Sequence, residues 1–312
     1  MTKSQVFGAE FLRTRAGGLA AVFAVIVTIV ALLGAACSAP PASPPDRGSD
    51  GSLPIVDRSD GAGARASLNE ITGEVLLPMS SYWYSDRENL IVNTAVAFLI
   101  YDCVEDAGFG GAPRGGAGKA LQDRSYGQWS RALAARNGFS PEIRKIPGVL
   151  DAQPERSPVT ARQQEAETKC YNSVGRAGFP ELLEGLAVDQ SVQNRIVQTS
   201  LALTDRDPDY LSYRRAWEDC VAAKGLKLAG SDSWSFQGAA SKEEEVRMAL
   251  LDVECKDSSG GAQLPYDILA QYEAAQMKDH QAELNEVASQ KAASVERAKQ
   301  VLRDHGVADA TL

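Results

Sequence analysis

Two short stretches decide the fold that this sequence predicts: DCVEDAGF at 102–109 and DCVAAKGL at 219–226. In both, a cysteine stands five residues before a glycine, and an apolar residue follows the glycine. Glycine in this position is typical of a helix end, because it readily takes the left-handed backbone conformation that closes the last turn. Each stretch therefore predicts the C-terminal end of a helix that carries a cysteine.

The two cysteines that follow these stretches are Cys170 and Cys255, and each stands at the end of a charged run that begins with an acid. The simplest explanation is an internal duplication of a helix–loop–helix unit with one cysteine on each helix. Four cysteines allow three pairings, and their number alone does not choose among them. The duplication predicts the pairs Cys103–Cys170 and Cys220–Cys255, whereas a chance match of such short motifs would leave the pairing open.

Signals for helix starts stand ahead of each of these cysteines. Capping boxes, in which a hydroxyl residue is followed three positions later by Glu or Gln, occur at Ser85, Thr160 and Ser241. The remaining helix begins at Asp207 and Pro208, an N-cap acceptor followed by proline at the first helical position. Spacings of three and four residues then predict one buried face, made by Tyr210, Tyr213, Trp217, Cys220 and Val221. Together these signals predict an all-α fold.

The N-terminal segment has the order of an export signal. A basic stretch precedes an apolar run at 19–36, which ends in small residues immediately before Cys37. This order resembles a bacterial lipoprotein signal, in which the cysteine becomes the acylated N-terminus, although Gly34 stands where that pattern has Leu, Val or Ile. Acylation of Cys37 would also leave an even number of cysteines in an oxidising compartment. We therefore expect residues 1–37 to be a signal peptide and Cys37 to be the lipidation site.

Two other interpretations of this segment stay open. Residues 17–36 are about as many as the roughly 20 apolar residues that span a bilayer core, so an uncleaved membrane anchor is the first alternative. The second is cleavage after Ala39 to give a freely secreted protein, although Pro40 would then follow the cut. In the lipidated and the anchored case, the positive-inside rule places the bulk of the chain on the outer face of the cell membrane.

The rest of the chain divides by composition. Residues 38–70 begin with a stretch rich in Pro, Ser and Gly, and we expect them to be a disordered tether. Residues 71–262 hold the four paired cysteines and are predicted to be a disulfide-bonded helical domain.

Residues 263–312 are predicted to be one long C-terminal helix. Its apolar positions follow a weak coiled-coil seam at Leu284, Ala288, Lys291, Val295, Ala298 and Leu302. This seam is suited to contact with a partner, to folding back on the body of the protein, or to simple exposure. Because its side chains are mostly small or polar, we expect the disulfide-linked body to fold without the segment after residue 264.

No catalytic, nucleotide or metal motif is recognisable. The net charge of −9 at pH 7 and the lack of a basic stripe argue against nucleic acid as a partner. The glycine-rich run at 108–119 resembles a phosphate loop but lacks the hydroxyl residue that should follow its lysine. His280 and His305 stand far apart, and the acids at 243–245 suit a helix N-terminus. We therefore expect no cofactor, no metal and no catalytic residue, and we expect the four paired cysteines to be structural.

The frame made by Cys220, Gly225, Asp252 and Cys255 resembles a group of uncharacterised exported helical lipoproteins from high-GC Gram-positive bacteria. The resemblance covers mainly residues 207–264 and implies an exported, disulfide-bonded protein without indicating an activity.

The function that we expect is that of a non-catalytic accessory protein of the cell envelope. Its partners would be the lipid membrane, through the N-terminal anchor, and another envelope protein. The first alternative is a small-ligand binding module with a pocket between the two helical units. The second alternative is an envelope hydrolase with a dispersed acidic site.

Overall fold

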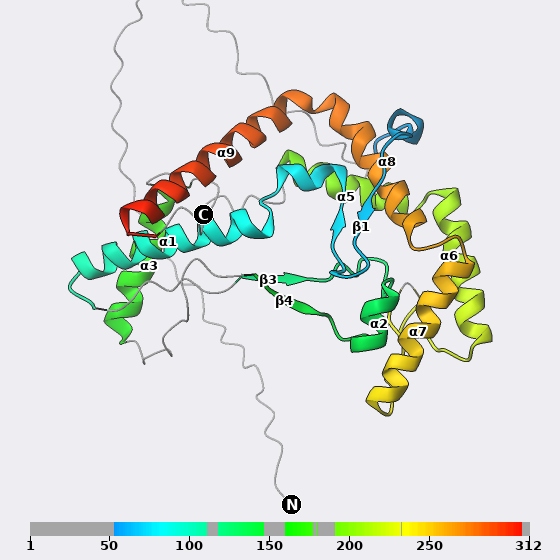
Figure 1. Cartoon of the computed structure of the whole chain (residues 1–312). Helices are drawn as coiled ribbons and strands as arrows, with labels where there is room; N and C mark the ends of the chain where they lie inside the picture. Colours follow the sequence, from blue (N-terminus) through cyan, green and yellow to red (C-terminus); the bar gives the residue numbers. More distant parts are fainter. Residues whose placement is uncertain are drawn as a thin grey trace, which may run out of the picture. The chain divides into compact units, whose positions relative to one another are not determined.

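A computed structural model describes residues 53–110, 118–146, 160–176, 179, 191–231 and 233–307 of the chain, all of them within one compact unit (Figure 1). This part is predominantly helical, so the predicted all-α class is confirmed. The α-helices are α1 (Asp86–Asp106), α2 (Arg131–Asn137), α3 (Ala161–Arg176), α5 (Val192–Thr204), α6 (Pro208–Ala223), α7 (Lys242–Ser258), α8 (Gln263–Asp279) and α9 (Gln281–Asp304).

Short 3-10 helices and β-strands accompany the α-helices. Two 3-10 helices, η1 (Arg58–Gly61) and η2 (Pro78–Tyr82), precede α1. Two antiparallel pairs of strands, which the sequence did not predict, are β1 (Ser67–Leu68) with β2 (Val75–Leu76) and β3 (Gly118–Leu121) with β4 (Ile143–Ile146).

Side-chain caps fix the start of each cysteine-bearing helix. The Ser85 hydroxyl accepts a hydrogen bond from Glu88 N, and the Glu88 carboxylate accepts one from Ser85 N, so the capping box of α1 is confirmed. Thr160 and Ser241 each accept from the backbone amide three residues later, at the starts of α3 and α7. Asp207 caps α6 by accepting from two backbone amides of the first turn. These helix starts depend on partners within a few residues, which is why the sequence predicts them well.

Two disulfides join the helices in the pairs that the duplication hypothesis predicts. Cys103 on α1 is bonded to Cys170 on α3, and Cys220 on α6 is bonded to Cys255 on α7. The glycine that follows α1 has a φ of 86°, and the one that follows α6 has a φ of 75°. The units are not independent repeats, however. The connection between α1 and α3 contains α2, β3 and β4, and α2 packs against α7 of the other unit.

The helix α8 lies in the core and contacts η1, η2, α5 and α6. Its buried residues include large aromatic and aliphatic side chains such as Tyr266, Ile268 and Leu269.

Two buried carboxylates on α8 accept hydrogen bonds from backbone amides of the N-terminal segment. Asp267 accepts from Ala66 N and Glu273 accepts from Met79 N. Ala66 lies just before β1, and Met79 lies in the first turn of η2, where backbone amides have no partner within the helix, so the carboxylates supply the missing acceptors.

The predicted disordered tether over 38–70 is wrong for residues 53–70, which belong to the folded unit. Arg58 in η1 forms a 2.9 Å ion pair with Asp207 at the start of α6. Gly61 lies so close to α8 that a side chain there would collide with the helix backbone. These contacts are made by charged groups and by glycine backbone. A prediction based on the low apolar content of the segment therefore could not detect them. The earlier part of the predicted tether lies outside the described residues.

The predicted single helix over 263–312, separate from the core, is also wrong. The helix is broken at His280, and both of its parts are core helices. α9 lies along α1 (Figure 1), and four of the six positions of the coiled-coil seam, Leu284, Val295, Ala298 and Leu302, are buried inside the protein. The large apolar residues of this interface come mainly from α1, so small residues on α9 allow close packing rather than prevent it.

We expect Leu302→Ala to lower the free energy of unfolding by about 2 to 5 kcal/mol, because a buried leucine side chain is replaced by a cavity. Leu302 is fully buried in the cluster between α1 and α9. Urea denaturation followed by circular dichroism measures the loss. Ser289→Ala, at an exposed position of the same helix, is the matched control and should change stability little. Equal small effects of both substitutions would show that α9 is not part of the core.

Glu273 predicts a pH dependence of stability. Its side chain is buried on α8, and burial raises its pKa from 4.5 to about 7, although the hydrogen bond from Met79 N opposes the shift. A pKa that is higher in the folded state gives stability that is fully present below pH 4.5 and is lost as the pH rises through 7. At about 1.4 kcal/mol for each pKa unit, the loss from this one group is about 3 kcal/mol.

We therefore expect Glu273→Gln to be more stable than the wild type at pH 8 and to differ little from it at pH 4.5. The glutamine side chain can still accept from Met79 N but carries no charge to desolvate. Urea denaturation of both proteins across this pH range measures the difference. An unchanged difference between the two proteins at all pH values would mean that Glu273 ionises as freely in the folded chain as in the unfolded one.

Candidate functional site

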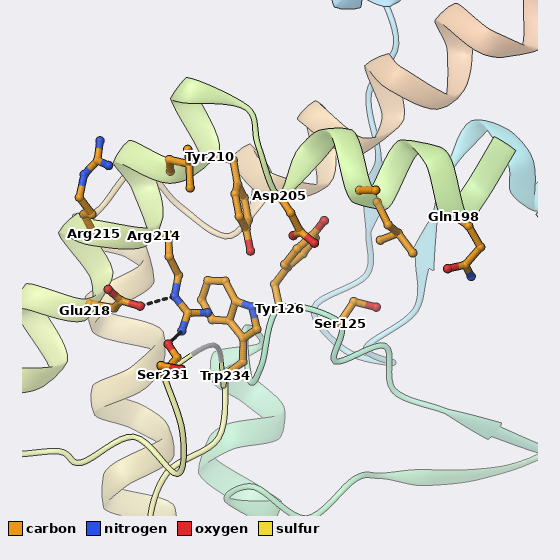
Figure 2. Close-up of a pocket in the computed structure, with 13 residues that line it drawn as sticks. Ser125, Tyr126, Gln198, Asp205, Tyr210, Arg214, Arg215, Glu218, Ser231 and Trp234 are labelled. Atoms are coloured by element: carbon orange, nitrogen blue, oxygen red, sulfur yellow. Dashed lines mark hydrogen bonds and ion pairs between the residues drawn. The ribbon is translucent and has the colours of Figure 1, made fainter. Parts of the chain in front are cut away.

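An open cavity of about 820 Å³ lies beside α5 and α6 (Figure 2). Its lining combines aromatic, aliphatic, uncharged polar and charged side chains: Ser125, Tyr126, Gln198, Leu201, Ala202, Asp205, Tyr210, Leu211, Arg214, Arg215, Glu218, Ser231 and Trp234. They come from α5 and its C-terminal end, from α6, and from the loops that precede α2 and α7. A cavity of this size is large enough for a small organic ligand.

The link between α5 and α6 sets the geometry of the cavity. α5 ends at Thr204 and α6 begins at Pro208, so the two helices that form its walls are joined by a very short turn. Asp205 is the C-cap residue of α5 and stands at this corner. Along α6, Tyr210 and Arg214 are one turn apart and therefore share the face that lines the cavity.

Arg214 organises the α6 wall. Its Nε donates to the Glu218 carboxylate at 2.6 Å, and its Nη2 donates to the backbone oxygen of Ser233 at 2.7 Å. The guanidinium carbon lies 4.2 Å from the ring centroid of Trp234 and 4.6 Å from that of Trp217, within the range of cation–π attraction. One side chain thus fixes both the loop before α7 and the tryptophan that this loop contributes to the cavity (Figure 2).

A buried ion pair lies behind this wall. Lys256 and Asp252, one turn apart on α7, are 1% and 0% exposed, and their charged groups are in direct contact. Asp252 Oδ1 also accepts from Trp217 Nε1 at 2.8 Å, and Lys256 Nζ lies 5.1 Å from the ring centroids of both Trp217 and Trp234. Burial lowers the pKa of Lys256 and raises that of Asp252, and the charge of each partner opposes the shift of the other. The two indole rings are therefore held between Arg214 and Lys256.

Tyr126 carries an unsatisfied polar group at the cavity. The residue is 4% exposed, and its hydroxyl oxygen has no hydrogen-bond partner among the described residues. Burial is the main reason that the pKa of Tyr126 is raised, with smaller contributions from Tyr210 and Asp205. A buried hydroxyl without a partner costs about 1 to 3 kcal/mol of folding free energy.

The residues that the sequence singles out lie away from this cavity. Cys37, the predicted lipidation site, and the apolar run before it are outside the described residues. Among the residues that are described, no helix has the length and the apolar character that crossing a membrane requires. The disulfide cysteines Cys103, Cys170, Cys220 and Cys255 are paired structurally, and none of them lines the cavity.

The two histidines have separate structural roles. His305 at the end of α9 contacts Asp102 on α1 at 2.9 Å and lies against Phe98, and His280 contacts Glu283 at 2.8 Å. The acidic run at 243–245 lies in the first turn of α7, as expected. In the described ranges, no group of three His, Cys, Asp or Glu side chains is arranged to hold a metal ion.

Sequence reasoning assigned Tyr210 correctly to the buried face of α6 but did not identify Tyr126, Trp234 or Asp205 as parts of a site. The available signal was the presence of two aromatic residues in each of two otherwise small and polar loops, SYGQW at 125–129 and SDSWSF at 231–236. Polar loops gain stability by burying such residues, so aromatic residues in them mark the points where loops dock.

Comparison with known proteins adds no relative. No protein-family model matches the chain, no curated protein matches its sequence, and no solved structure matches its fold. The resemblance to exported lipoproteins, which rests on the cysteine frame, therefore stays a prediction, and the function has to be argued from the chemistry of the cavity.

Proposed function

We propose that this protein is a lipid-anchored binding protein on the outer face of the cell membrane, and that the cavity beside α5 and α6 takes a small ligand. The observation that carries the proposal is the cavity of about 820 Å³ itself, whose lining brings the aromatic side chains of Tyr126, Tyr210 and Trp234 together with charged groups. Small-molecule sites in proteins are concave and combine aromatic surface with polar groups that orient the ligand.

The rigid support of the lining also favours binding. Trp234 is held between the guanidinium of Arg214 and the buried ammonium of Lys256, and Tyr210 lies on a helix that is capped and disulfide-bonded. A lining that is already ordered loses little conformational entropy when a ligand binds. The cavity also combines side chains of the first cysteine unit, Ser125 and Tyr126, with side chains of the second.

Docking to another envelope protein is the second candidate function. The C-terminal helix is a weak candidate for the interface, because the apolar face of α9 is covered by α1. The hairpin of β1 and β2 is better suited, since Ile71 at its turn is 71% exposed and Leu76 on β2 is 49% exposed. An accessory role would then use this hairpin, and the cavity would be free for its ligand.

The anchoring part of the proposal rests on the sequence around Cys37. We expect the mature protein to begin with an acylated Cys37, and we expect Cys37→Ser either to keep its signal segment or to be released into the medium. Intact-mass measurement of protein from the membrane fraction tests this, with Ser38→Ala as the matched control that should still be processed. A mature protein that retains Met1, or that starts at another residue, would contradict the lipoprotein assignment.

The binding part is tested by filling the cavity. We expect protein purified from its natural membrane to carry a small bound species in native mass spectrometry, and we expect Ala202→Trp to lose it, because Ala202 lines the cavity and indole would occupy its space. Ala288→Trp, at an exposed position on α9, is the control and should keep the species. A wild-type protein without a bound species, or equal occupancy in both variants, would argue against a ligand in this cavity.

A further inference from the structure

A second pocket, of about 370 Å³, lies at the start of α7 and shares no lining residue with the cavity beside α5 and α6. The loop before α2 contributes Arg124 to it, the chain directly after α2 contributes Phe139, and the loop before α7 contributes Phe236. Because α2 packs against α7, segments that are far apart in the chain meet in this pocket. Its size is sufficient for a small organic ligand.

Arg124 is a partly buried cation in the lining of this pocket. Its Nη1 donates a hydrogen bond to the backbone oxygen of Phe139. Within the described part of the chain, no carboxylate forms an ion pair with Arg124, and its Nε has no hydrogen-bond partner. Charged side chains that are withdrawn from water are normally paired with an opposite charge. Arg124 therefore lacks the anion that its surroundings favour.

The acids around Arg124 are already paired with other cations. Glu245, which lines the same pocket, forms a 3.1 Å ion pair with Lys242. The buried Asp252 is in direct contact with the ammonium group of Lys256. Burial lowers the pKa of Arg124, although the negative charges of Asp252 and Glu245 oppose this shift. One positive charge at the pocket, that of Arg124, is thus left without a partner of its own.

Much of the remaining lining is apolar. The rings of Phe139 and Phe236 pack with 5.3 Å between their centroids, and both belong to the hydrophobic cluster that contains the buried Met248. These side chains can contact the hydrocarbon part of a ligand whose charged group lies at Arg124. A second negative charge on the ligand would be repelled by Glu245. The lining therefore favours a single negative charge attached to an apolar group.

We propose that this pocket binds a small monocarboxylate with an apolar body, whose carboxylate pairs with Arg124 and whose hydrocarbon part contacts Phe139, Phe236 and Met248. A guanidinium group carries five N–H donors and is well matched to carboxylates, and the contact with Phe139 uses only one of these donors. This site goes beyond the binding function proposed above, because it is a separate pocket with a ligand of its own.

Isothermal titration calorimetry of the purified wild-type protein at pH 7 provides the first test. The probes are hexanoate and phenylacetate, which are ionised at this pH, and the uncharged hexanamide and phenylacetamide, which have nearly the same shape. We expect each acid to bind at least tenfold more tightly than its amide, and inorganic phosphate to bind more weakly than either acid. Equal binding of acids and amides, absence of binding by both acids, or a preference for phosphate would overturn the inference.

Two arginine variants then assign the negative charge of the ligand to its partner. In Arg124→Gln the acids should lose their preference over the amides. Arg247→Gln, at an exposed position of α7 that does not line the pocket, is the matched control and should keep the preference. A preference that survives in Arg124→Gln, or that is lost equally in both variants, would contradict the role of Arg124.

A third set of variants tests the pocket without changing its charge. Gly238 lines the pocket, and a Cβ atom added there would meet no atom within 4 Å, so the backbone accepts a larger side chain. We expect Gly238→Trp to bind hexanoate at least tenfold more weakly than the wild type, with an unchanged thermal melt by circular dichroism. Gly63→Trp, at an equally unobstructed glycine outside the pocket, is the control and should bind normally.

The variant that fills the larger cavity separates this inference from the binding function proposed above. Ala202→Trp should bind hexanoate as the wild type does, because Ala202 lines only the cavity beside α5 and α6. Wild-type hexanoate binding by Gly238→Trp, or its loss in Ala202→Trp, would overturn the second site. Neither result bears on whether the larger cavity holds the species sought by native mass spectrometry.

Discussion

The packing of α8 against the N-terminal segment is the interaction on which the rest of the structure depends. Asp267 accepts a hydrogen bond from Ala66 N and forms a 2.6 Å ion pair with Arg65, and Glu273 accepts from Met79 N. Burying a carboxylate is costly unless hydrogen bonds compensate for the lost water. These two acids are therefore tolerated in the core because the segment that contains η1 and η2 donates hydrogen bonds to them.

The same helix positions both walls of the cavity. Tyr272 on α8 donates to the Asp207 carboxylate at 2.9 Å, and Asp207 is the residue that caps α6. In the loop before α2, the ring of Tyr126 packs against that of Tyr266 on α8, with 4.9 Å between the ring centroids. The Tyr266 hydroxyl also donates to the Asp123 carboxylate at 2.6 Å. The start of α6 and the loop that carries Tyr126 are thus fixed from one helix. The ligand contacts that we propose use loop residues, but their positions are set by the core.

The sequence predicts well those features whose partners are close in the chain. The caps at Ser85 and Ser241 act over three residues, and both were identified together with the cysteine-bearing helices that they begin. Apart from the two disulfides, which the repeated cysteine frame predicts, features with distant partners were missed. Arg58 and its partner Asp207 are 149 positions apart, and neither the apolar content nor the periodicity of the sequence around Arg58 predicts their contact. The small side chains of α9 led to the prediction that this helix lies outside the core. The helix is nevertheless buried, because α1 supplies the large apolar residues of their interface. The cavity escaped detection because its aromatic residues come from short loops and helix ends that share no motif.

The docking of residues 53–70 has a consequence for the order in which the protein folds. This segment is synthesised early, yet Asp267, which binds both Arg65 and Ala66, follows about 200 positions later in the chain. A polypeptide that emerges N-terminus first cannot complete its core until its last quarter has appeared, and contacts of such long separation slow folding. If the chain is exported, as we propose from the sequence around Cys37, this delay is an advantage. The part that enters the export channel first would then have no completed core to resist translocation, and the fold would close only when α8 arrives on the outer side.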